Sequence, residues 1–361
     1  MMFERPGAIM PVPDIQITTP KDYDAWDRYA WLHEQGGPYL TTAWKVAVEK
    51  AYGHKTFYLA AYVNRKITGL LPLVKIKPPM QKGTLVSLPF CDYGGIVANH
   101  HQDAEALLNQ AFSLASKMKV ELEIRSCNPC PIIEQNAVFK QVTDKCRMVM
   151  ELPENSVALW SGFKSKLRSQ IKRASKDGLF VRLGHIELID DFYRVFSRNM
   201  RDLGSPVHSG KWLKNIVSGF NNRAMLAVVY KGDFPVGAGL MLMHNRMVTI
   251  PWASTLKAFN RLSPNMLLYW AFLEYAADYG YRYFDFGRST PGEGTYAFKK
   301  QWGARPVALS WYRCDRGSHF DGKPTSGNNG RLRKAAEKAW QRMPLAAANA
   351  LGPKLRKYID K

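Results

Sequence analysis

The sequence predicts an α/β (α+β) protein of two similar halves, each a mixed sheet flanked by helices. Three observations predict this class. The 361 residues are too many for one ordinary hydrophobic core. Hydrophobic residues make up 46% of the chain and aromatic residues 12%, as in globular proteins. The order helix, helix, antiparallel meander, helix, strand, strand occurs twice along the chain.

The first half is expected to be a domain of residues 1–152. Asn64 and Arg65, between two apolar runs, predict the turn of a hairpin. The elements expected in this half are helices at 23–35, 42–53 and 103–118, strands at 55–63, 66–77, 120–126 and 146–152, and a glycine-rich strand or loop at 89–98.

The second half is expected to be a domain of residues 153–318 that repeats the order. It begins with a basic helix and ends with a strand that follows a short helical turn. The elements expected in it are helices at 156–177, 187–200, 210–220, 263–279 and 295–302, and strands at 179–183, 224–231, 234–244, 246–255, 281–287 and 305–314.

A basic segment, residues 328–361, follows a polar, glycine-rich linker. We expect one or two helices there, broken at Pro344 or at Gly352–Pro353. Because the segment stands apart from both repeats, we expect its removal to leave the core folded. We also expect it to bind an anionic partner, either RNA or an anionic membrane surface.

A net charge of +21 is the strongest signal in the composition. Residues 163–182 hold seven Lys and Arg against one Asp, and residues 330–361 hold nine against two acidic residues. A solvated helix face explains one such run, but two of them in so basic a chain favour an anionic partner such as nucleic acid, anionic lipid or a phosphorylated substrate. Without a zinc finger, an RNP motif or a helix-turn-helix pattern, sequence-specific DNA binding is not expected.

The remaining composition indicates where the protein works. No apolar run approaches the roughly 20 residues that span a bilayer, and the first residues lack a signal-peptide pattern. The five cysteines agree with a reducing compartment, so we expect a cytoplasmic protein, with peripheral contact at the inner membrane face as a further expectation. Cys127 and Cys130 have the spacing of half a metal site, but no second pair follows, so neither a metal nor a cofactor is expected.

Residues 284–304 concentrate polar chemistry around a bend. Arg288 is a fork-shaped donor suited to a carboxylate or phosphate, and Lys299 is a cation on the helical turn after the bend. Asp285 is a candidate substrate contact, with pairing to an arginine or capping of the backbone as the alternative. Tyr296 is a candidate acceptor contact, and burial with a satisfied hydroxyl is equally compatible with its position.

Four stretches carry a resemblance to a known family: "LRSQIKRASKDGLFVRL", "RDLGSPVHSGKWL", "RLSPNMLLYWAFLEYAADYGYRYFDFGRS" and "GTYAFKKQWGARPVAL". They resemble the Fem-type (FemAB-like) aminoacyltransferases, and within them the FemAB-related branch associated with exosortase/PEP-CTERM exopolysaccharide systems. The resemblance is strongest over residues 156–312. It implies two tandem GNAT-like (acyl-CoA N-acyltransferase-like) domains with the chemistry in the second. It also implies transfer of an acyl or aminoacyl group, from aminoacyl-tRNA in well-studied members, to an amine of a peptidoglycan or exopolysaccharide precursor.

The resemblance also assigns residues. It places the family's catalytic Phe-Lys at Phe298 and Lys299, with the lysine near the transferred acyl group. The residues that it suggests near the acceptor are Arg201, Ser205, His208 and Lys211 in one loop, and Asp92 and Tyr93 at a glycine-rich strand end.

Two other interpretations remain open. One is an acyl-CoA-dependent N-acyltransferase of the same fold, although the helix at 263–279 lacks the glycine loop that usually holds the coenzyme's pyrophosphate. The other is a non-catalytic protein that binds polysaccharide or lipid-linked intermediates. A Lys299 on an exposed turn would matter for transfer and little for stability, so its substitution separates these interpretations.

Overall fold

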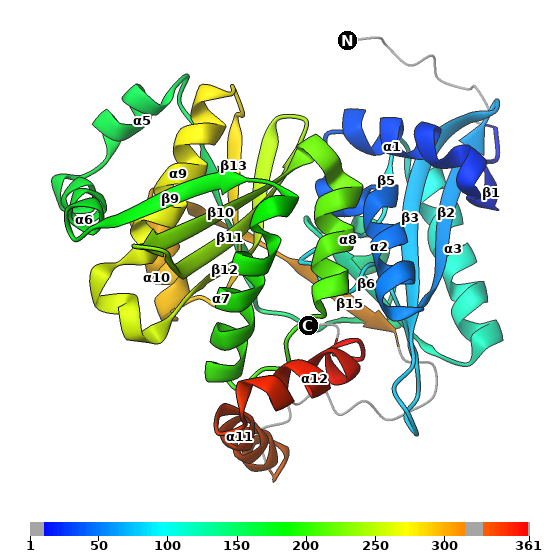
Figure 1. The fold of residues 1–361 in the computed structure, drawn as a ribbon. Coiled ribbons are helices and arrows are strands. Elements are labelled where there is room, and N and C mark those ends of the chain that lie inside the picture. The colour runs from blue at the N-terminus through cyan, green and yellow to red at the C-terminus, as the bar shows by residue number, and fades with distance from the viewer. Residues whose placement is uncertain (1–10, 315–327, 360–361) are drawn as a thin grey trace.

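A computed structural model of the chain describes residues 11–314 and 328–359, and it has the predicted fold class. Two mixed sheets, each flanked by helices, lie side by side, with the first half of the chain in blue to cyan and the second in green to yellow (Figure 1). Among the described residues, no helix combines the length and the apolar character that crossing a membrane requires.

The first sheet, sheet A, has the strand order β1-β2-β3-β4-β6-β15-β7, with β5 paired to β3. Its hairpin forms as the sequence predicts, because Asn64 and Arg65 take φ values of 50° and 63°, which the tight turn requires. The strands are β1 (Asp14–Ile17), β2 (Lys55–Val63), β3 (Lys66–Ile76), β4 (Thr84–Val86), β5 (Val97–Ala98), β6 (Glu121–Ser126), β7 (Phe139–Gln141) and β15 (Ser310–Cys314).

The second sheet, sheet B, has the strand order β14-β8-β13-β12-β11-β10-β9. Its strands are β8 (Cys146–Glu151), β9 (Leu179–Gly184), β10 (Ala224–Lys231), β11 (Phe234–His244), β12 (Met247–Thr255), β13 (Tyr283–Ser289) and β14 (Arg305–Ala308). β12 and β13 pair in parallel at three positions, which end at Thr249 and Asp285. Both strands continue beyond that point, so their carboxyl ends are free to flank a pocket.

The helices cover the sheets in the predicted order. They are α1 (Tyr23–Leu32), α2 (Thr42–Tyr52), α3 (His101–Met118), α4 (Pro131–Glu134), α5 (Ser156–Gly162), α6 (Ser165–Lys176), α7 (Ile189–Asp202), α8 (Gly210–Phe220), α9 (Pro264–Asp278), α10 (Gly294–Gln301), α11 (Asn328–Gln341) and α12 (Leu345–Arg356). The single basic helix expected at 156–177 is two helices, because Phe163 leaves the helical conformation (ψ 144°) and buries its ring against Trp302.

The two sheets exchange strands, so they do not follow the predicted boundary between residues 152 and 153. β8, from the first half, pairs with β13 and β14 in sheet B. The strand expected at 305–314 is two strands, β14 and β15, which are separated at Leu309. The backbone N–H of Leu309 still bonds to the carbonyl of Lys145, next to the β8 pairing of β14. After this point the chain enters sheet A as β15, the orange strand that reaches the first half in Figure 1.

The two halves also share one hydrophobic core. α2 packs against α8, and Trp44 and Trp212 meet edge to face with ring centroids 5.1 Å apart. Both rings are fully buried. Burial of two such aromatics across the junction makes relative movement of the halves costly.

The C-terminal helices break at Pro344, while Pro353 lies inside α12. α12 packs on α7, and its Gly352 leaves no room for a side chain, because a Cβ there would lie 3.0 Å from the backbone nitrogen of Val207. Ala348 is also buried. The segment thus makes packed contacts with the second half, and the expectation that it can be removed without harm stays a prediction.

Candidate functional site

A pocket of about 300 Å³ opens at the carboxyl ends of β12 and β13, where their parallel pairing has stopped. Ligands of α/β sheets commonly bind outside the carboxyl ends of parallel strands. The pocket is lined by the end of β12, the start of α9 and one flank of α10, through Ala253, Ser254, Thr255, Asn265, Leu268, Tyr269, Gly294, Thr295, Phe298 and Lys299.

Lys299 enters this pocket from α10 and is 7% exposed. Its Nζ donates hydrogen bonds to the backbone carbonyls of Gly287 (2.9 Å) and Arg288 (2.8 Å). An ammonium group carries three N–H donors, and no third partner occurs among the described residues. One donor is thus available to a group bound in the pocket.

Burial lowers the pKa of Lys299 to about 8, while the carboxylates of Asp92 and Asp285 act in the opposite direction. The ammonium form therefore persists at neutral pH, despite the apolar surroundings, and becomes neutral just above it. A cation so poorly solvated interacts strongly with any negative charge that develops beside it.

Gly287 shapes the backbone that Lys299 contacts. Its φ of 76° is a conformation that other residues rarely adopt, and a Cβ would lie 3.0 Å from the carbonyl oxygen of Ile250. The bend turns the carbonyls of residues 287 and 288 toward the lysine.

Asp285 is buried and fully engaged. It accepts a hydrogen bond from the backbone N–H of Gly287 (2.8 Å) and pairs with Arg147 on β8 at 3.2 Å. Burial raises its pKa, and Arg147 opposes the rise. These contacts match the alternative interpretation of Asp285 as an arginine partner and a backbone cap. Because both carboxylate oxygens are engaged, Asp285 is poorly placed to contact a substrate.

Asp92 and Arg288 join the two halves beside the lysine. Asp92 Oδ2 accepts from the backbone N–H of Arg288 (3.1 Å), and Oδ1 lies 3.5 Å from its Nε. The Arg288 guanidinium also lies over the Trp311 ring, 5.1 Å from its centroid. The Asp92 carboxylate, about one-sixth exposed, thus fixes the bend of the second half from the first half.

The remaining candidates near the bend are less accessible. The Tyr93 ring is buried, and the Arg147 guanidinium lies 5.1 Å from its centroid. Tyr296 is half-buried against the apolar core of sheet B and does not line the pocket. Phe298 does line it, where its ring meets Tyr269 edge to face at 5.2 Å.

The loop after α7 lies elsewhere, against the C-terminal helices. His208 is 1% exposed, with its Nδ1 2.7 Å from the Tyr52 hydroxyl and its Nε2 accepting from Arg356 (3.1 Å). Burial lowers the pKa of His208 well below its usual value, so the ring is neutral. These contacts do not fit the substrate or acid–base role suggested by the sequence.

The other members of that loop are also apart from the pocket. Arg201 donates to the carbonyl of Met343 (3.2 Å), Ser205 is half-buried, and Lys211 is exposed at the start of α8. The structure brings Asp92, Asp285, Arg288, Phe298 and Lys299 together and does not bring these residues to them.

Several lining residues escaped the sequence reasoning. Ser254 and Thr255 end β12 and Asn265 lies in the first turn of α9, and all three line the pocket. Arg147, on β8, does not line it but pairs with Asp285. Arg147 could have been found, because a guanidinium in a buried strand needs a carboxylate partner. The others carry no local signal, since only the divergence of β12 and β13 makes a pocket beside them.

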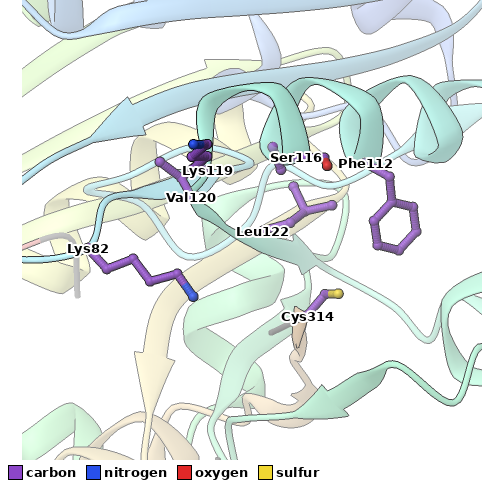
Figure 2. Close-up of a pocket in the computed structure, with 8 residues that line it drawn as sticks. Lys82, Phe112, Ser116, Lys119, Val120, Leu122 and Cys314 are labelled. Atoms are coloured by element: carbon purple, nitrogen blue, oxygen red, sulfur yellow. The ribbon is translucent and has the colours of Figure 1, made fainter. Parts of the chain in front are cut away.

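A second pocket, of about 240 Å³, lies under the end of α3. Figure 2 shows Lys82, Phe112, Ser116, Lys119, Val120, Leu122 and Cys314 around it. Because Val120 and Leu122 stand at the amino end of β6, this pocket is at the end of the sheet opposite to the one where ligands of parallel strands bind. We therefore do not include it in the site.

Comparisons with known proteins agree with this geometry. Residues 161–300 match the family model of the acetyltransferase (GNAT) domain. No curated protein matches the sequence. The second half thus contains an acyltransferase domain, as predicted, and Lys299 lies inside the matched range.

Solved structures with the same fold span nearly the whole chain. The crystal structure of FemX superposes with a TM-score of 0.66 at 16% identity, covering 90% of this chain and all of that one. L-PGS from Bacillus licheniformis superposes with a TM-score of 0.52 at 13% identity, and the match covers 93% of this chain and 98% of that one. A tandem GNAT protein from the clavulanic acid biosynthesis pathway superposes with a TM-score of 0.53 at 10% identity, and the match covers 86% of this chain and all of that one. At these identities the likeness establishes the fold, two tandem GNAT-like domains.

Proposed function

We propose that this protein is a Fem-type transferase that moves an acyl or aminoacyl group onto an amine of a cell-envelope or exopolysaccharide precursor. The observation that carries the proposal is the buried cation Lys299, which lines the pocket beside the end of β12 and has two of its three N–H donors engaged among the described residues. The fold shared with FemX supports the Fem-type assignment, and the exosortase/PEP-CTERM branch stays a prediction from sequence.

The chemistry that suits this pocket is attack of an amine on an activated carbonyl. The nitrogen adds to the carbonyl carbon, a tetrahedral oxyanion forms, and the carbon–oxygen or carbon–sulfur bond to the donor then breaks. The leaving group takes up the proton that the amine loses. Lys299 stabilises the oxyanion with its third N–H, while the carbonyls of Gly287 and Arg288 hold the ammonium in place.

The neighbouring residues position the lysine and do not react. Asp92 and Asp285 favour the protonated lysine, and both are themselves held by hydrogen bonds to the bend at residues 287 and 288. Phe298 forms the apolar wall beside the acyl group, so the pocket admits an acyl or aminoacyl chain of modest size.

We favour aminoacyl-tRNA as the donor over acyl-CoA. The net charge of +21 suits a polyanion, and Pro264 and Asn265 begin α9 without the glycine loop typical of coenzyme binding. The tandem GNAT protein among the structural neighbours, which was solved without AcCoA, keeps acyl-CoA as the second candidate. For the acceptor, we propose a lipid-linked glycan precursor met at the inner membrane face.

The test is a transfer assay with defined donors. The purified chain is incubated with charged tRNA or with acyl-CoA, together with a lipid-linked glycan extract, and new amide adducts are sought by mass spectrometry. We expect adducts with charged tRNA that are absent with Lys299→Met. Adduct formation from acyl-CoA alone would replace the donor assignment, and tight binding of the glycan without transfer from any donor would support the non-catalytic interpretation.

A further inference from the structure

α10 carries two adjacent lysines that line different pockets. Lys299 faces the pocket described above, while Lys300 faces a larger one, of about 360 Å³, on the other flank of the helix. Consecutive side chains on a helix point about 100° apart, so the two cannot serve one group. The pocket beside Lys300 lies between α10 and the turn from α5 to α6, and we call it the flank pocket.

The flank pocket is strongly positive. Lys164 and Lys166, from the start of α6, line it together with Lys300, and all three side chains are exposed. In the part of the chain that the structure describes, none of these three lysine side chains makes a hydrogen bond or an ion pair, and no carboxylate lines the pocket. Three unpaired cations around one cavity attract an anion.

Backbone donors add to this charge. α6 runs for 12 residues and begins without a side-chain cap, and the N–H groups of Ser165 and Lys166, at the positive end of the helix, have no partner in the described part of the chain. Of these two residues, Lys166 lines the pocket. Gln170, one turn further along, also lines the pocket. The lysines and these backbone groups together offer an anion both charge and directed donors.

An independent observation comes from Trp302, which forms part of the pocket wall. Its side chain is 1% exposed, and its Nε1 has no hydrogen-bond partner among the described residues. An indole N–H is a donor only, and leaving it buried without an acceptor costs about 1–3 kcal/mol. The buried indole forms part of the wall beside the three lysines, and its N–H is covered by protein atoms.

We propose that the flank pocket binds a phosphate group of the acyl donor; this rests on the proposed transfer function. An α-helix with its side chains is about 10–12 Å across. A phosphate beside Lys300 would therefore lie roughly that far from an acyl group beside Lys299, with α10 between them. The phosphate belongs either to the phosphodiester backbone of RNA or to the pyrophosphate of coenzyme A, and the experiment distinguishes the two.

The experiment compares two triple variants of the full chain. The first, Lys164→Ala/Lys166→Ala/Lys300→Ala, empties the flank pocket of charge. The matched control, Lys172→Ala/Arg173→Ala/Lys176→Ala, removes the same charge from exposed positions further along α6. Binding of an RNA hairpin with a single-stranded 3′ end, of coenzyme A and of inorganic pyrophosphate is measured by fluorescence or calorimetry over a range of salt concentrations.

We expect the first variant to bind the RNA hairpin at least tenfold more weakly. The slope of log K against log salt concentration should fall by the equivalent of about one to two phosphate contacts. The affinity of the control for the hairpin should change less than threefold. Pocket-dependent binding of coenzyme A but not of RNA would assign the phosphate to the coenzyme. Equal losses in the two triple variants, or no loss in the first, would overturn the site.

Steady-state kinetics separate this inference from the function on which it rests. The first triple variant should raise KM for the donor and leave kcat within about threefold, because Lys299 is untouched. Normal transfer with an unchanged donor KM refutes the flank pocket and leaves the function standing. Pocket-dependent phosphate binding without transfer by the unmodified protein refutes the function and leaves the pocket.

Discussion

Each half of the molecule contains a strand–helix–strand crossover between two parallel strands. The pockets at the carboxyl ends of these strands differ in the residues that line them. In the second half, β12, α9 and β13 frame the pocket of about 300 Å³ that Lys299 enters. In the first half, β4 and β6 also pair in parallel at three positions, with α3 between them, and a pocket of about 120 Å³ lies at the corresponding end. Among the residues that the structure describes, no charged side chain lines this smaller pocket.

The difference arises from the segment that the chain makes after each crossover. After β13, the glycine bend leads to an eight-residue helix, α10, that returns its lysine to the strand ends. After β6, the chain makes the four-residue helix α4, and Cys127, Asn128 and Cys130 line the pocket instead. The crossover therefore supplies the space, and the next segment decides whether a charged side chain lines it.

The largest effect is expected from Lys299→Met, a variant of similar length without charge. Losing one electrostatic donor to a developing oxyanion costs about 10²–10³ in kcat. Tm should also fall by a few degrees, because the carbonyls of Gly287 and Arg288 lose their donor. This replaces the expectation of unchanged stability, since Lys299 is buried and not on an exposed turn.

The control lies in the first half. Asn128→Ala changes the pocket at the corresponding position and should leave kcat unchanged in the same transfer assay. A comparable loss of kcat would mean that both crossovers take part in the reaction, and the contrast between them would fail.

A second large effect is expected from Gly287→Ala. With φ at 76° and the Ile250 carbonyl 3.0 Å from the new Cβ, the bend must shift, at a cost of about 1–3 kcal/mol in the free energy of unfolding. Chemical denaturation measures this change. Gly210→Ala serves as the control, because a Cβ there meets no atom within 4 Å and its φ is not positive; it should stay near the unmodified protein.

The pH dependence sharpens the role of the lysine. If Lys299 acts as a cation, kcat measured in single turnovers should fall as pH rises through about 8, the pKa to which burial lowers it. A rise of kcat through that pH would show that Lys299 is a proton acceptor instead. In Lys299→Met, this fall of kcat with rising pH should be absent.

The same pKa predicts a pH trend in stability. The ordinary lysine value is 10.5, so between about pH 8 and 10.5 the unfolded chain binds more protons at this position than the folded chain. The contribution of Lys299 to the free energy of unfolding therefore increases with pH across that window, and its penalty is fully present below about pH 8. Denaturation of the unmodified protein and Lys299→Met across the window measures the difference.

The smallest effect is expected from Asp92→Asn. It removes the carboxylate that raises the pKa of Lys299 most, so the falling limb of kcat should move to lower pH while kcat near pH 6 changes little. The backbone bond from Arg288 can still be accepted by the amide oxygen. An unshifted limb would indicate that another group controls the titration.

The sequence predicted much of the fold because its signals were local. The hairpin turn at Asn64–Arg65, the order of elements in each half and the bend at Gly287 all depend on residues close in the chain. Phe298 and Lys299 were singled out by the resemblance to a family motif within one helical turn, and both line the pocket.

The features that the sequence did not predict depend on contacts between distant residues. The strand exchange is one example, since β8 and β15 are ordinary apolar strands whose partners cannot be identified from their own pattern. The burial of His208 under α12 is another, because a histidine in a polar loop gives no sign of a helix that covers it. The pocket wall at Ser254 and Asn265 exists only because two strands diverge.

The strand exchange also constrains how the protein is made. In sheet A, β15 lies between β6 and β7, so those two strands have no common neighbour until residues 310–314 have left the ribosome. By then all of sheet B has been synthesised, and both sheets are completed at nearly the same time. Until then the sheet of the N-terminal half is incomplete and leaves strand edges exposed. A nascent chain stopped after residue 152 should therefore stay protease-sensitive, and one extended past residue 314 should become resistant in a single step.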